Sequence, residues 1–155
     1  MIVYTGGTFD LFHVGHARLL KNCWVMARGG KVIVSVNTDE FALSYKNAPV
    51  CSLEERMEVV GSCRWVDKVI VNYGGADSKP AIESVGPDLI IIGDDWADKD
   101  YYKQMGFTAE WLDEHNIKVR YVPYTKHVST TIIKNRLRDH YYGIIDYTAT
   151  FISPV

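Results

Sequence analysis

Short runs of hydrophobic residues alternate along this chain with longer segments in which hydrophobic positions recur every three or four residues. The short runs are rich in β-branched residues and are bounded by Gly, Pro, Asn or Asp, which is typical of strands. They predict five strands, at residues 2–4, 31–36, 68–71, 88–92 and 118–122. Near-continuous hydrophobic runs such as DLIII at 88–92 favour strands buried on both faces, as in a parallel sheet.

The longer segments predict helices. Residues 14–28 carry one hydrophobic stripe, formed by Val14, Ala17, Leu20, Trp24 and Val25. Ser52 and Glu55 form an S-x-x-E capping box that begins a helix ending near residue 63. Further helices are predicted at 80–85, at 109–115 and at 129–138, the last with Ser129 as its N-cap.

The alternation of strands and helices predicts an α/β fold: a Rossmann-like, doubly wound, five-stranded parallel sheet flanked by helices in a single domain, residues 1–138. Right-handed crossovers then place a ligand beyond the carboxyl ends of the strands, at the switch point. Residues 139–155 form an aromatic C-terminal tail (HYYGIIDYTATFISPV follows Asp139). Because the tail is too hydrophobic for a free linker, we expect it to pack on this domain or on a dimer partner.

Composition narrows the classes of function. The 155 residues are 47% hydrophobic and 23% charged, which is typical of a globular domain. A net charge of −2 gives no general attraction to nucleic acid or to anionic membranes, so an anionic ligand needs a local cluster of cations. The first ten residues lack the basic and apolar pattern of a secretory signal, and no run approaches roughly 20 apolar residues, so neither a secretory signal nor membrane insertion is expected. Three widely spaced cysteines favour a reduced, cytoplasmic setting.

The segment from Gly6 to His16 (GGTFDLFHVGH) is the most informative part of the sequence. It joins the first predicted strand to the first predicted helix. Its glycines allow the backbone to approach a ligand, and the start of the helix offers free amides and a positive dipole end, which suit phosphate. His13 and His16, three residues apart, project from neighbouring positions and can donate hydrogen bonds to oxygens that gain charge during phosphoryl transfer. Gly15 leaves space for a nucleotide.

Other roles for the histidines stay open on these grounds. A pair at i and i+3 is often structural, and it also suits two ligands of a metal, although no third ligand is evident. The segment is neither the G-x-G-x-x-G fingerprint of dinucleotide-binding proteins nor a P-loop, which would carry a lysine.

The segment TFDLFHVGH resembles the HxGH motif of the nucleotidyltransferase superfamily, in its cytidylyltransferase branch. Further matches follow in order: TDEF at 38–41, EER at 54–56, RWVDKV at 64–69, GDDW at 93–96 and VSTTIIK at 128–134. The resemblance covers roughly residues 1–138 and extends to the glycerol-3-phosphate cytidylyltransferases within that branch. It implies transfer of CMP from CTP to a small phosphorylated alcohol, with Mg²⁺ bound with CTP and with no covalent enzyme intermediate.

The resemblance also implies the roles of individual residues. His13 and His16 would bind the phosphates of CTP and stabilise the transition state, and Lys46 would join them as a catalytic cation. Other nucleotide-binding residues would be Gly7, Thr8, Phe9, Gly15, Gly93, Asp94, Asp95, Trp96, Tyr124, Thr125, Lys126, Ser129, Thr130 and Thr131. The acceptor would be held by Asp10, Lys46, Arg64 and Lys79. No residue is assigned as a metal ligand.

Each of these assignments has a structural alternative. Ser129 and its neighbours also form a plain N-cap, and Asp10 could simply hold the glycine-rich turn. Lys46 and Lys79 could be solvated surface lysines, the commoner case for lysine. Arg56 could form a structural ion pair.

Two residues depart from the family pattern R-T-x-G-I-S-T before the last helix. Tyr124 stands where the family has arginine, and His127 where it has glycine. Tyrosine cannot replace the bidentate phosphate contact of arginine, so Lys126 or His127 is expected to compensate.

Several functions remain alternatives to the cytidylyltransferase. The same chemistry could serve another phosphorylated polyol or a phosphonate, or the chain could be an ATP-dependent adenylyltransferase. A nucleotide-binding module without turnover and a redox dinucleotide-binding protein belong to other classes. The resemblance, together with the tail, predicts a homodimer.

Overall fold

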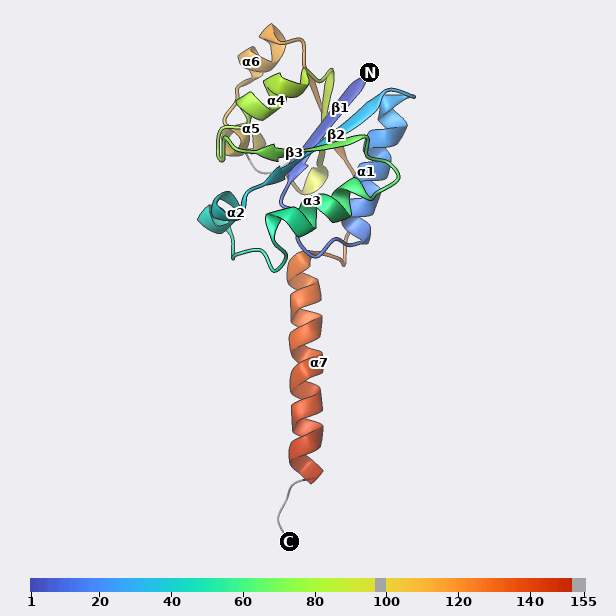
Figure 1. Cartoon of the computed structure of the whole chain (residues 1–155), viewed down its shortest axis with the longest axis vertical. Coiled ribbons are helices and arrows are strands. Elements are labelled where there is room, and N and C mark those ends of the chain that lie inside the picture. The colour runs from blue at the N-terminus through green and yellow to red at the C-terminus, as the bar shows by residue number, and fades with distance from the viewer. Residues whose placement is uncertain (97–99, 152–155) are drawn as a thin grey trace.

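The computed structural model describes residues 1–96 and 100–151 (Figure 1). Its centre is a five-stranded parallel sheet of β1 (Ile2–Gly7), β2 (Lys31–Asn37), β3 (Lys68–Asn72), β4 (Leu89–Gly93) and β5 (Lys118–Val122). The strand order is β3-β2-β1-β4-β5. β2 and β3 are added on one side of β1, and β4 and β5 on the other, so the strand order reverses between β1 and β4. The predicted doubly wound sheet and all five strands are therefore confirmed.

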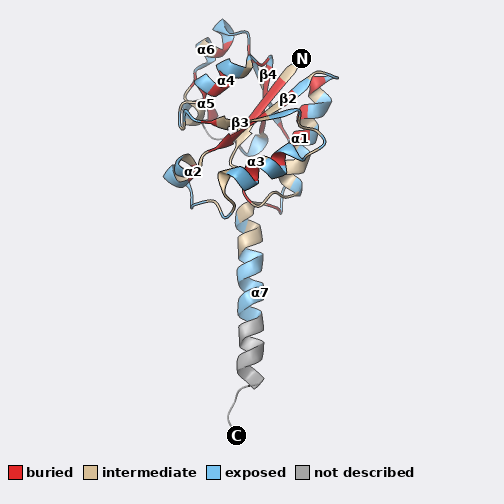
Figure 2. Ribbon diagram, in the orientation of Figure 1, coloured by how far each residue is buried: buried red, intermediate tan, exposed pale blue. Residues whose placement is uncertain are grey.

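Helices cover both faces of the sheet (Figures 1 and 2). One face packs against α1 (Val14–Ala27) and α3 (Leu53–Gly61), and the other against α4 (Lys79–Val85), α5 (Tyr101–Met105) and α6 (Ala109–Glu114). Successive residues of a strand point to opposite faces. Accordingly Val3 packs with the α1 side chains Leu20 and Cys23, whereas its neighbour Tyr4 packs with Ile82 of α4.

Two short helices escaped prediction. The sequence analysis placed a loop after β2, but α2 (Asp39–Tyr45) occupies most of it, because the Thr38 hydroxyl caps the amide of Phe41 at 3.2 Å. Helix α5 has Asp100 as its N-cap, whose carboxylate accepts from the amide of Lys103 at 3.0 Å, and Gly106 as its C-cap with φ of 75°. Helices of seven and five residues are too short to show a hydrophobic period, so their caps are what define them.

The last helix is longer than predicted. α7 runs from Thr130 to Phe151 instead of ending at residue 138, and it projects away from the domain (Figure 1). From Asn135 to Gly143 its residues are exposed (Figure 2). Most of the side chains of the aromatic tail lie outside the described residues, so its packing on a partner stays a prediction.

Two further features concern the cysteines and membrane spanning. Cys23, Cys51 and Cys63 are all free thiols. Within residues 1–96 and 100–151, no helix is long and apolar enough to cross a membrane.

Candidate active site

A cavity of about 900 Å³ opens beyond the carboxyl ends of β1 and β4, where the strand order reverses. This is where open α/β sheets bind ligands. Its walls come from the turn before α1, from α2 and the loop that follows it, from the ends of β2 to β4, and from the start of α7. The volume is within the range that holds a nucleotide and a small second substrate.

His13 and His16 lie side by side in this cavity, with their rings stacked at a centroid distance of 3.8 Å. His13 is the N-cap of α1: its Nδ1 accepts a hydrogen bond from the amide of Gly15 at 3.1 Å. His16 Nδ1 accepts from the amide of His13 at 3.2 Å, which completes a capping box. Because both Nδ1 atoms are acceptors, each neutral ring carries its proton on Nε2 and keeps that donor for a ligand.

Both histidines are neutral donors before a ligand binds. Burial lowers the pKa of His13, and it lowers the pKa of His16 to about 3, with smaller contributions from His13 and from the positive charge of Lys46. At neutral pH the pair can therefore supply hydrogen bonds without charge. Positive charge for an anionic ligand must come from other side chains.

The turn between β1 and α1 is held in a conformation that L-residues seldom adopt. Phe9 has φ of 54° and Leu11 has φ of 46°. The buried Phe9 ring contacts His16 at a centroid distance of 5.2 Å. A Cβ atom at Gly15 would lie only 2.9 Å from the His13 ring, so glycine leaves space for this histidine. The strained backbone thus fixes the positions of both imidazoles.

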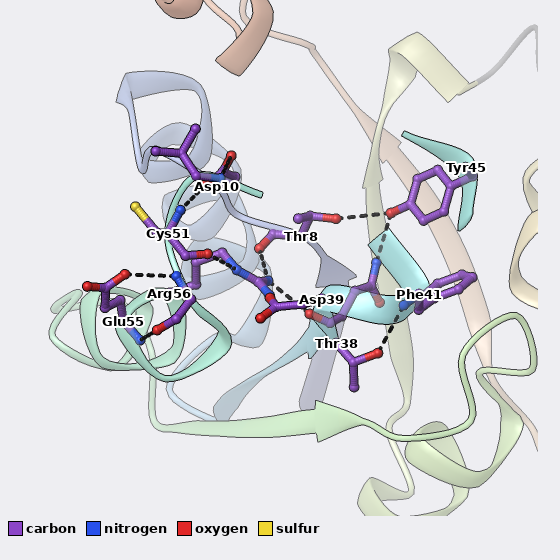
Figure 3. A network of polar contacts seen from close by, with 12 residues as sticks. Thr8, Asp10, Thr38, Asp39, Phe41, Tyr45, Cys51, Glu55 and Arg56 are labelled. Carbon is purple, nitrogen blue, oxygen red and sulfur yellow. Dashed lines mark hydrogen bonds and ion pairs between the residues drawn. The ribbon is translucent and has the colours of Figure 1, made fainter. Parts of the chain in front are cut away.

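Asp10 and Arg56 tie this turn to the rest of the site (Figure 3). The Asp10 carboxylate accepts from the amides of Val50 and Cys51, each at 2.9 Å. These bonds, with the nearby positive charge of Lys134, hold the pKa of Asp10 below its usual value although burial opposes them. Asp10 lines the cavity, but its carboxylate is already engaged in holding the loop after α2.

Arg56 of α3 is fully buried and makes bonds to three segments at once. Its Nη1 donates to the carbonyls of Thr8 at 2.6 Å and Asn37 at 2.9 Å, and its Nε donates to Cys51 O at 3.1 Å. Its Nη2 forms an ion pair with Asp39. Arg56 therefore forms the structural ion pair that the sequence analysis gave as one alternative. Its bonds also join the ends of β1 and β2.

Two lysines lie among the described residues that line the cavity. Lys46, the C-cap of α2, was expected there, and its Nζ lies 5.3 Å from the centre of the Tyr45 ring. Lys134 was not predicted; its Nζ lies 3.7 Å from Asp10 Oδ2. The sequence held a signal for it, because Lys134 is four residues after Thr130 and so shares a face of α7 with that expected phosphate ligand.

The start of α7 closes the cavity beside the histidines. Ser129 Oγ accepts from the amide of Ile132 at 3.1 Å, which confirms the predicted N-cap. Thr130 Oγ1 donates to Asp10 O at 2.8 Å and so fastens α7 to the turn. Ser129, Thr130 and Thr131 all line the cavity, as expected.

The segment after β4 forms the opposite wall, with a 3-10 turn over Asp94–Trp96. Gly93 and Asp95 line the cavity. Asp94 instead accepts from the amide of Tyr124 at 2.8 Å and so joins β4 to the loop after β5. Tyr124 lines the cavity, and its pKa is raised by partial burial and by the charge of Asp95. The side chain of Trp96 lies outside the described residues.

Other expected residues divide between the cavity and the surface. Gly7, Thr8, Phe9 and Thr125 line the cavity. Arg64 is exposed and lies away from it. Lys79 is also outside, since its Nζ donates to Gly106 O at 2.6 Å and pairs with Asp77 at 3.0 Å.

Lys126 and His127 likewise do not line the cavity. His127 has φ of 65°, a left-handed conformation that favours glycine. This left-handed conformation explains why the family has glycine at the position. His127 adopts the conformation with some backbone strain. Its carbonyl accepts from Arg136.

These features define a class of enzyme: a Rossmann-like nucleotidyltransferase, with paired imidazole donors at a helix start and cations beside them. Residues 4–136 match the Cytidylyltransferase-like family, and the chain belongs to that family. The identification from the HxGH segment is thereby confirmed.

Three relatives illustrate the similarity. The chain is 34% identical over 136 residues to the glycerol-3-phosphate cytidylyltransferase of Bacillus subtilis, covering 87% of this chain and 95% of that protein. It is 40% identical over 96 residues to the ethanolamine-phosphate cytidylyltransferase of Dictyostelium discoideum, covering 61% of this chain but only 26% of that longer protein. A solved lipopolysaccharide core biosynthesis protein from Thermoplasma volcanium superposes with a TM-score of 0.66 at 25% identity, over 83% of this chain and 98% of that one.

Proposed function

We propose that this enzyme transfers CMP from CTP to a small phosphorylated alcohol similar to glycerol 3-phosphate, giving a CDP-alcohol and pyrophosphate. The observation that carries the proposal is the pair of Nε2 donors of His13 and His16, held in the cavity beside the start of α7. The match to a glycerol-3-phosphate cytidylyltransferase over nearly its whole length supports the choice of CTP and acceptor.

The reaction requires positioning and charge neutralisation more than a protein nucleophile. A phosphate oxygen of the acceptor attacks the α-phosphorus of CTP, and the bond from that phosphorus to the bridging oxygen of the β-phosphate breaks. His13 and His16 donate hydrogen bonds to the phosphate oxygens that gain charge in this step. Lys46 and Lys134 supply the positive charge that the neutral imidazoles lack.

Magnesium enters this account as part of the substrate Mg·CTP. The described residues contain no group of three or more His, Cys, Asp or Glu that could hold a metal ion. Mg²⁺ is commonly held by substrate phosphates with few protein ligands, which fits this cavity.

Lys134 is expected to take the place of the missing family arginine. Lys134→Ala should raise the KM for CTP roughly tenfold or more, since a hydrogen bond to a charged group contributes about 1.5–3 kcal/mol. Lys126→Ala is the matched control and should change it less than twofold, because Lys126 lies outside the cavity. Steady-state kinetics at saturating acceptor measure both values. A larger effect for Lys126→Ala than for Lys134→Ala would contradict the assignment.

Pyrophosphate release with each of the four nucleoside triphosphates tests the choice of nucleotide. With glycerol 3-phosphate as acceptor, kcat/KM should be highest for CTP by a wide margin. A preference for ATP would make the chain an adenylyltransferase with the same site.

We infer that the enzyme is a homodimer in which α7 pairs with a second copy. Helices in proteins gain most of their stability from packing of an amphipathic face, yet α7 leaves the domain along most of its length (Figure 1). Its described part carries a stripe of Ile133, Leu137 and Tyr141, of which Leu137 is 60% and Tyr141 is 63% exposed. Such a stripe is suited to a partner helix.

The double variant Leu137→Asp/Tyr141→Asp is therefore expected to weaken self-association by at least tenfold in sedimentation equilibrium. Asn135→Asp, on the opposite side of the helix, adds charge without touching the stripe and should leave the dissociation constant nearly unchanged. Association that survives in the double variant would assign the dimer contact to another surface.

A further inference from the structure

The cavity is divided by charge. Its described ionisable lining residues gather around the histidines, at Lys46, Lys134 and Asp10, and beyond β4, at Asp95. The neutral end of the cavity has a described lining without charged side chains, drawn from β1, α2, α5 and the ends of β2 and β3: Tyr4, Phe41, Tyr45, Gln104, Asn37 and Asn72. No residue in this neutral end was expected to take part in the reaction.

A row of hydrogen bonds crosses this neutral end. Asn72 Nδ2 donates to Asn37 Oδ1 at 3.1 Å and to Gly75 O at 3.0 Å, so both of its hydrogens are used. Asn37 Nδ2 donates in turn to the Tyr45 hydroxyl at 3.1 Å. The Tyr45 hydroxyl lies 3.0 Å from Thr8 Oγ1 (Figure 3). Tyr45 therefore accepts from Asn37, and the hydrogen between the Tyr45 and Thr8 hydroxyls can come from either of them.

The two ends of the row offer a ligand different hydrogen-bonding groups. The Thr8 hydroxyl lines the cavity, and a ligand phosphate that accepts its hydrogen would leave Tyr45 as the donor to Thr8. At the other end Asn72 is 2% exposed, and its Oδ1 has no hydrogen-bond partner. The orientation of this amide is fixed, because turning it over would set Oδ1 against two carbonyl oxygens. A buried carbonyl oxygen without a partner is costly unless a ligand donates to it.

We propose that this row is the acceptor-binding part of the site and that it selects a phosphorylated polyol, with its phosphate near Thr8 and a hydroxyl donating to Asn72. The inference rests on the proposed function and adds the residues that recognise the acceptor and its hydroxyl. An amino-alcohol phosphate would bring an ammonium group into this end, where the described lining offers no carboxylate and where Lys46 Nζ already lies 5.3 Å from the centre of the Tyr45 ring. Burying that charge without an anionic partner is unfavourable.

Acceptor competition tests the proposal on the full-length enzyme with Mg·CTP. The panel contains glycerol 3-phosphate, a five-carbon polyol phosphate, phosphoethanolamine, and propyl phosphate, which has the carbon chain of glycerol phosphate without its hydroxyls. We expect kcat/KM for a polyol phosphate to exceed that for phosphoethanolamine and for propyl phosphate at least tenfold. Efficient use of either of the last two would overturn the polyol assignment and leave CMP transfer standing. No pyrophosphate from any acceptor would overturn both.

Two variants test the row itself. Asn72→Ala removes the orphan oxygen, and Tyr45→Phe removes only the hydroxyl that links Asn37 to Thr8. Each should raise the KM for the polyol phosphate roughly three- to tenfold, as for one hydrogen bond, and leave the KM for CTP within twofold. Tyr73→Phe is the matched control, since Tyr73 is 85% exposed and outside the cavity. If Asn72→Ala does not fold, Tyr45→Phe decides: an unchanged acceptor KM, or an equal rise in both KM values, overturns the proposal.

Discussion

Replacing His16 with alanine is expected to lower kcat by two to three orders of magnitude while leaving the fold intact. The physical reason is the loss of one preorganised donor: His16 Nδ1 is fixed by the His13 amide, so its Nε2–H points to the ligand without reorganisation. Removal of one such donor typically costs 10²–10³ in rate. Single-turnover kinetics measure the chemical step directly.

The control for this variant is His115→Ala. His115 lies at the end of α6, where its ring contacts Trp111, and it does not line the cavity. Its loss should change kcat less than twofold. A folded His16→Ala enzyme with near-normal turnover would remove the histidine from the transition state.

The second large effect is expected on stability. Arg56→Met should lower the free energy of unfolding by about 3–5 kcal/mol, the typical cost of removing one partner from a buried charged network. Methionine is close in length to the arginine stem but leaves the carbonyls of Thr8, Asn37 and Cys51 without their donor. Urea denaturation followed by circular dichroism measures the change.

Arg64→Met provides the comparison, because Arg64 is an exposed arginine close in sequence. The free energy of unfolding of this variant should lie within about 0.5 kcal/mol of the parent value. A loss for Arg56→Met no larger than that for Arg64→Met would show that the network around the turn contributes little to stability. The account would then need another support for the strained backbone at Phe9.

The fold was predictable from sequence because its strands are short, β-branched and clearly bounded, and because strand and helix alternate. What escaped prediction was local. α2 and α5 depend on single capping side chains, Thr38 and Asp100, rather than on a hydrophobic period. The length of α7 depends on a segment of mixed polarity, which is compatible both with a helix and with a packed tail.

The site was predictable where its residues are neighbours in sequence, as for His13 and His16. It was not predictable where distant segments meet. Lys134 reaches the cavity because Thr130 is bonded to Asp10, 120 positions away in the chain. Lys79 has the sequence context of an acceptor ligand, yet it is held by Gly106, a contact that exists only once α5 has packed against α4.

Phosphorus-31 NMR of the reaction mixture tests the central proposal most directly. With enzyme, Mg·CTP and glycerol 3-phosphate, the account predicts pyrophosphate and a new diphosphate diester in equal amounts, with loss of both substrate signals. The His13→Ala/His16→Ala enzyme should give neither product on the same timescale. Hydrolysis of CTP without a diphosphate diester, or no change of CTP in the presence of a folded parent enzyme, would contradict CMP transfer by this site.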